Sequence, residues 1–137
     1  MQQVYLAELC IHITGARQHD VGWLDNLMFE AGAFYLMNRG YMDFVRLFRI
    51  ANAGSFFVSR AKSKLQFTHH YSLPVDRLTG LRSDYVGKPT LAKSRNAFPA
   101  LLRKVRYYDT EIERKLVFLT NNLEIPALRV AMLYKLR

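Results

Sequence analysis

Three basic residues recur at a spacing that could place cations in a row. Arg60, Lys62 and Lys64 are each two residues apart. Successive side chains of a β-strand point to opposite faces, so residues two apart share a face and these three would line one side of a strand. Such a row could contact the phosphate groups of a polyanion. A solvated strand face is the alternative, and the spacing leaves both interpretations open.

A second basic cluster follows later in the chain. Arg103, Lys104 and Arg106 lie on an alternating stretch, with Tyr107 and Tyr108 beside them. Basic side chains beside aromatic rings are typical of surfaces that meet nucleic acid. The same alternative of a solvated strand face applies here.

The distribution of charge says more than the net charge of +9. Residues 1–43 carry two basic and five acidic residues, a net charge of −3, and the remainder carries 18 basic and six acidic residues, a net charge of +12. This asymmetry indicates that the later part of the chain faces a polyanion, and nucleic acid is the first candidate. A basic surface that only keeps the protein in solution is the competing explanation.

The remaining reactive residue types do not combine into a site. His69 and His70 are adjacent, so on a strand they point to opposite faces and do not chelate one metal ion together. His12 and His19 have no carboxylate or cysteine at ligand spacing. Cys10 is the single cysteine, which excludes an internal disulfide and fits a reducing cytoplasm.

The elements that position these residues can be predicted from hydrophobic periodicity. A helix that begins near Asp20 and closes at Gly32 precedes a short apolar strand, and a second helix with Phe44, Val45, Phe48 and Ala51 on one side follows it. This order predicts a β–α–β unit with parallel strands and a right-handed crossover. The strands are expected at residues 4–13, 33–37, 55–59, 64–72, 81–86, 102–107 and 115–120, and helices at 20–32, 41–51 and 126–137.

The last predicted helix is still periodic where the chain stops. Leu128, Ala131, Met132 and Lys135 share one face, and no terminating residue follows Pro126. We therefore expect the chain to be a piece of something larger.

The 137 residues of the chain, half of them apolar, suffice for one domain with a real core, and no apolar run is long enough for a membrane helix. These features predict a soluble protein.

Several stretches resemble one protein family in the correct order. Residues 34–44, FYLMNRGYMDF, resemble the region of the second catalytic aspartate in DDE transposases of bacterial insertion sequences, in the branch with the Y-x2-R-x3-E-x6-K signature. Residues 19–25, 55–63, 105–109 and 117–122 resemble other segments of that family. Tyr134 and Arg137 fit the first two letters of the signature.

The resemblance implies an α/β fold: a partial ribonuclease H-like mixed sheet with flanking helices, spanning residues 1–137 as one domain, and a β-rich basic insertion at 61–114. It also implies DNA transposition by two-metal phosphoryl transfer, in which three carboxylates hold two Mg²⁺ ions. Transposon-end DNA would be the partner, the family also allows a homodimer, and the location would be the cytoplasm. Arg39, Arg60, Lys62, Lys64, Arg103, Lys104 and Arg106 become the candidate DNA-binding residues. Arg39 and Arg137, accompanied by Tyr134, become candidates for contact with the scissile phosphate.

The same resemblance predicts that no metal site is intact. Asn38 stands at the position of the second aspartate, and its neutral amide does not balance two divalent cations. The first aspartate is expected upstream of Met1 and the glutamate downstream of Arg137. Glu8 and Asp43 are poor substitutes, and Asp43 is expected to face solvent or cap a helix.

The sequence therefore predicts a transposase remnant that is inactive, binds no Mg²⁺ and retains DNA binding. The principal alternative is a non-catalytic DNA-binding or interaction module that reuses the fold. A small basic nuclease with an unrelated site is a third interpretation, but no complete ligand set supports it.

Overall fold

The computed structural model describes residues 4–6, 29–37, 43–62 and 64–136. The predicted helix at 20–32 lies almost wholly outside these residues, as do Glu8, Cys10, His12 and His19. The predicted first strand is described only as β1 (Val4–Leu6).

The described part of the chain forms one mixed sheet with the strand order β1-β2-β3-β7-β6-β5-β4. Strands β1, β2 and β3 are parallel, whereas β3–β7, β7–β6, β6–β5 and β5–β4 are antiparallel pairs. The remaining strands are β2 (Phe34–Met37), β3 (Phe56–Arg60), β4 (Phe67–Ser72), β5 (Leu81–Pro89), β6 (Leu102–Asp109) and β7 (Arg114–Thr120). The prediction of an α/β fold with a mixed sheet is confirmed.

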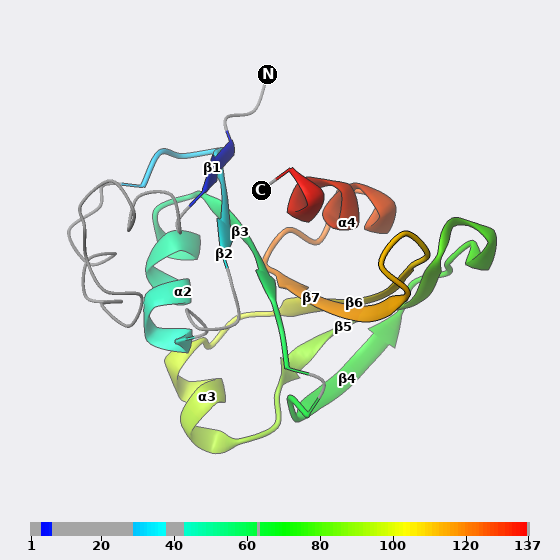
Figure 1. Cartoon of the computed structure of the whole chain (residues 1–137). Helices are drawn as coiled ribbons and strands as arrows, with labels where there is room; N and C mark the ends of the chain where they lie inside the picture. Colours follow the sequence, from blue (N-terminus) through cyan, green and yellow to red (C-terminus); the bar gives the residue numbers. More distant parts are fainter. Residues whose placement is uncertain (1–3, 7–28, 38–42, 63, 137) are drawn as a thin grey trace.

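Helices flank this sheet on both sides. Helices α2 (Phe44–Asn52) and α3 (Ala92–Ala97) lie on one side, and α4 (Ala127–Lys135) lies on the other (Figure 1). A short 3₁₀ turn, η3 (Arg77–Thr79), lies in the connection between β4 and β5.

The β2–α2–β3 unit forms as the apolar pattern predicts. The four residues of β2 are all buried, and Phe34 to Met37 pair in parallel register with Phe56 to Ser59. Asp43 is the N-cap of α2, where its carboxylate accepts hydrogen bonds from the backbone N–H groups of Val45 and Arg46 at 3.0 and 3.4 Å. The predicted capping role of Asp43 is therefore confirmed.

Two buried clusters, one on each side of the sheet, form the core. Tyr35 and Met37 of β2 belong to the cluster under α2 and α3, whereas Phe34 and Leu36 belong to the cluster under α4. Strand alternation explains the division, because neighbouring residues point to opposite faces. A strand that is covered on both faces needs apolar side chains on both, and this is why the apolar run of β2 is uninterrupted by polar residues.

The helix faces differ from the predicted ones. In α2 the fully buried residues are Leu47 and Ile50, while Val45 is 57% exposed, so the prediction for Val45 is wrong. In α4, Met132 and Lys135 are exposed although Ala131, predicted to share a face with them, is buried. The buried residues of α4 are Ala127, Val130, Ala131, Leu133 and Tyr134.

The segment 61–114 contains β4, β5, β6 and α3. Strand β4 begins at Phe67 rather than at Lys64, and β5 extends from Leu81 to Pro89, beyond the predicted end at Val86. Helix α3 was not predicted. It has six residues and no side-chain hydrogen bond at its N-cap, so it carries little local signal.

Candidate nucleic-acid interface

Strand β2, after which the resemblance predicts the aspartate position, ends at Met37. Asn38 and Arg39, which follow it, and Arg137 lie outside the described residues. Of the predicted catalytic positions only Tyr134 is described. Its side chain is 5% exposed, and its ring centroid lies 4.9 Å from that of Phe118 on β7. Tyr134 therefore helps to hold α4 against the sheet.

The loop between β7 and α4 is fixed by two asparagine side chains. The side-chain oxygen of Asn121 accepts a hydrogen bond from the backbone N–H of Phe57 at 2.9 Å, and its amide nitrogen donates to the carbonyl of Ser55 at 3.0 Å. The oxygen of Asn122 accepts from the backbone N–H groups of Glu124 and Ile125. The two asparagines thus tie the loop before α4 to the start of β3 and shape the turn that leads into the helix.

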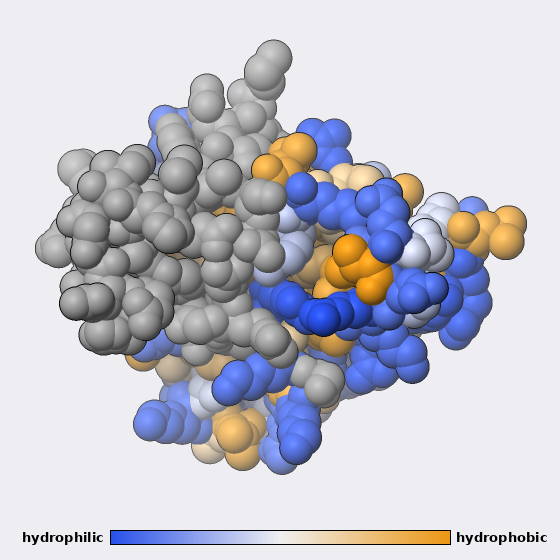
Figure 2. All heavy atoms as spheres, in the orientation of Figure 1, coloured by the Kyte–Doolittle hydropathy of each residue, from blue (hydrophilic) through white to orange (hydrophobic). Residues whose placement is uncertain are grey.

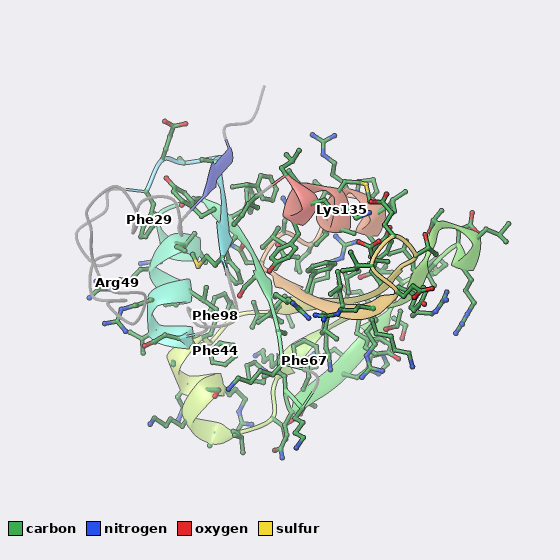
Figure 3. All side chains as sticks on the ribbon, in the orientation of Figure 1. Phe29, Phe44, Arg49, Phe67, Phe98 and Lys135 are labelled. Atoms are coloured by element: carbon green, nitrogen blue, oxygen red, sulfur yellow. The ribbon has the colours of Figure 1, made fainter. Side chains whose placement is uncertain are left out.

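The C-terminal end of α4 has a polar contact with β6. Lys135 lies on α4 with its ammonium group 3.4 Å from the carboxylate of Asp109 and 5.5 Å from the centroid of the Tyr107 ring (Figure 3). The aromatic contact of Tyr134 and this ion pair fix the orientation of the helix on the sheet.

Among the described residues, no three His, Cys, Asp or Glu side chains lie close enough together to hold a metal ion. Magnesium prefers charged oxygen ligands, and this part of the chain provides no such set. The described residues therefore do not fit the two-metal site that the resemblance implies.

Arg103 is not a phosphate contact, which corrects the prediction for this residue. Its guanidinium donates to both carboxylate oxygens of Asp84 at 2.8 Å, and both side chains are 3% exposed. The same guanidinium donates to the carbonyl groups of Asn122 and Ile125. Its hydrogen-bonding capacity is used inside the protein, where it joins β5 and β6 to the loop before α4.

Lys104 is also a poor candidate for contact with DNA. It lies on the opposite face of β6 from Arg103, is 5% exposed, and places its ammonium group 5.9 Å from the centroid of the Phe67 ring. Burial, and secondly the charge of Arg106, lower its pKa. A lysine that is 5% exposed presents little surface that a phosphate could reach.

Arg60, Lys62 and Lys64 do not form a row on one strand. Strand β3 ends at Arg60, which is half-buried, and the two lysines lie exposed in the connection before β4. The alternation argument therefore fails for this group, although Lys62 and Lys64 still face solvent.

Arg106 is the predicted residue that combines exposure with a place on the sheet. Arg106 pairs with Val117 of β7. Its side chain points to the opposite face of β6 from those of its buried neighbours Val105 and Tyr107. A pocket brings it together with three cations that sequence reasoning missed: Arg77, Arg82 and Lys115. They come from η3, β5 and β7, so no local spacing in the sequence links them.

The surface over β4–β7 is mostly hydrophilic (Figure 2). Apolar side chains interrupt it in places, as they do on most protein surfaces. No helix among the described residues has the length and apolar character needed to cross a membrane.

Compared with protein-family models and with curated proteins, the chain matches none significantly.

Proposed function

We propose that this chain is a remnant of a DDE transposase core that does not cleave DNA and retains DNA binding. The observation that carries the proposal is the sequence at the end of β2. There the buried run Phe34–Met37 leads into Asn38-Arg39-Gly40-Tyr41, which matches the family's strand and loop with an amide in place of the aspartate.

The order of elements supports the resemblance. A parallel β–α–β unit, an antiparallel extension and a final helix packed on the sheet follow one another in the order that the matched segments require. This order is consistent with a partial ribonuclease H-like sheet with the segment 61–114 as its insertion. The proposal of this fold family thus rests on two arguments, the matched sequence segments and the order of the strands and helices along the chain.

The proposed loss of cleavage depends on the ligand chemistry. When bound, Mg²⁺ would activate the attacking oxygen and stabilise the leaving oxygen. Asn38 offers a neutral amide at the one family ligand position that this sequence matches. Within residues 4–6, 29–37, 43–62 and 64–136, no three His, Cys, Asp or Glu side chains are grouped so that they could hold a metal ion in its place.

An assay of plasmid nicking tests this part of the proposal. The purified chain with MgCl₂ should leave supercoiled plasmid intact, and Asn38→Asp should also be inactive because one restored carboxylate does not balance two divalent cations. Reproducible nicking by the wild-type chain that disappears in Asn38→Ala would overturn the inactive assignment.

The proposed DNA binding relies on the exposed basic residues that remain after Arg103 and Lys104 are set aside. Lys62, Lys64 and Arg106 are exposed, and all three belong to the part of the sequence with a net charge of +12. Binding to duplex DNA should weaken as salt rises, with a slope that reports the number of phosphates neutralised. A chain with no DNA affinity at low salt would contradict this part of the proposal.

A non-catalytic DNA-binding module is the second candidate. It is favoured by the continuous sheet and the two buried clusters, which make the described part of the chain a coherent unit. Thermal unfolding separates the two candidates. One cooperative transition favours a module, whereas a broad transition with aggregation favours a remnant.

A further inference from the structure

A pocket of about 460 Å³ is bordered by four cations from four different elements. They are Arg77 of η3, Arg82 of β5, Arg106 of β6 and Lys115 of β7.

The sheet register explains how these cations converge. Lys115 pairs with Tyr108, and Arg106 pairs with Val117, so Arg106 and Lys115 are diagonal neighbours on one face of adjacent strands. Arg82 lies in an irregular part of the β5–β6 register, and its guanidinium carbon is 5.5 Å from the centroid of the Tyr108 ring. Stacking against this ring restrains Arg82 at the pocket.

The described residues leave the charge of the pocket without a partner. Among them no Asp or Glu lines the pocket, and none of its four cations forms a salt bridge. Like charges at this spacing repel one another, and a bound anion would relieve that repulsion. Tyr107, Leu116 and Val117 complete the lining with apolar surface.

We propose that this pocket binds phosphate groups of a DNA backbone. Guanidinium groups match phosphate oxygens with paired N–H donors, Lys115 adds a point charge, and the apolar wall suits the sugar between two phosphates. The proposal rests on the DNA binding proposed above and assigns it to a site of which sequence reasoning identified only Arg106.

The test compares two double variants that each lose two positive charges, one inside the pocket and one outside it. Arg106→Gln with Lys115→Gln neutralises two pocket residues, both exposed and without a described hydrogen bond. The matched control, Lys93→Gln with Arg129→Gln, neutralises two exposed residues on α3 and α4. Circular dichroism and thermal unfolding are used to check that both variants retain the wild-type fold. Affinity for a fluorescein-labelled duplex of about 20 base pairs is then measured by anisotropy between about 50 and 200 mM salt.

We expect the pocket variant to lose roughly tenfold in affinity for each side chain removed. Its slope of log K against log salt should fall by about 0.9 for each phosphate that the variant no longer neutralises. The control variant should stay within about threefold of wild type, because distant exposed charges are screened.

Three results would overturn the proposal, and they differ in what they imply for the function. If the pocket and control variants lose affinity equally, DNA binding stands but the pocket is not its site. If the wild-type chain binds no DNA at low salt, both the pocket assignment and the proposed function fail. If pyrophosphate raises the melting temperature of the wild-type chain but not of the pocket variant while DNA does not bind, the site takes small phosphate anions rather than DNA.

Discussion

The guanidinium of Arg103 and the carboxylate of Asp84 form a two-point ion pair on adjacent strands, with both N···O distances at 2.8 Å. Each side chain is almost completely buried. Since the same guanidinium also holds the carbonyls of Asn122 and Ile125, this pair links the sheet to the loop from which α4 begins. A residue that belongs to a basic cluster in the sequence thus stabilises the interior in the structure.

Breaking this pair should be costly. Arg103→Met leaves the carboxylate of Asp84 buried without its partner and should lower the free energy of unfolding by about 3–5 kcal/mol. Replacing both residues, with Asp84→Leu added to Arg103→Met, should cost less than the single change because no uncompensated charge remains. Urea denaturation measures both values. A single variant within about 1 kcal/mol of wild type would contradict the structural role of the pair.

The side chain of Asn121 replaces a strand partner for the backbone at the start of β3. Asn121→Ala would leave the N–H of Phe57 and the carbonyl of Ser55 without their hydrogen bonds, and should lower the free energy of unfolding by about 2 kcal/mol. Asn121→Asp keeps the acceptor but loses the donor, so it should be destabilised as well. Equal stability of Asn121→Ala and wild type in urea would show that water replaces both bonds.

Gly80 allows the β4–β5 connection to approach β6 closely. Its φ is +102°, and a Cβ at this position would lie 2.7 Å from the carbonyl oxygen of Tyr108. Gly80→Ala should therefore cost about 2–3 kcal/mol, from steric overlap and an unfavourable backbone conformation. Gly32→Ala is the control. Gly32 also has a positive φ, of +82°, but a Cβ there meets no atom of the described residues within 4 Å, so only about 1 kcal/mol should be lost. Equal losses in the two variants would mean that the contact with Tyr108 is unimportant.

The lowered pKa of Lys104 predicts a pH dependence of stability. Because the folded protein holds this proton less tightly than the unfolded chain does, the unfolded chain binds more protons between the lowered pKa and the ordinary value of 10.5. The contribution of Lys104 to stability therefore rises with pH across that interval. Lys104→Met lacks this term, so the melting temperature of wild type should rise relative to that of the variant as pH increases toward 10.5. A difference between the two melting temperatures that is constant with pH would contradict the prediction.

The local pattern of apolar and capping residues was sufficient to predict those helices and strands whose formation depends on residues close together in the sequence. The continuous apolar runs ending at Met37 and beginning near Phe56 predicted buried parallel strands, because a strand covered on both faces needs apolar residues throughout. Asp43 before an apolar helical repeat predicted a capped helix, and the cap is present. These features depend on backbone geometry and on the burial of residues that are adjacent in the sequence.

The sequence by itself thus determined a basic α/β chain with its strands in order, and tertiary structure decided which cations face solvent. Arg103 and Arg106 lie three residues apart on β6, yet the first is enclosed by Asp84 and the loop before α4, and the second is exposed. Alternation separates the two faces of a strand but does not reveal which face a distant helix will cover. The pocket cations likewise meet only because the strand register brings β5, β6 and β7 together. Contacts between residues far apart in the chain depend on how the elements pack, and that information is not present in local spacing.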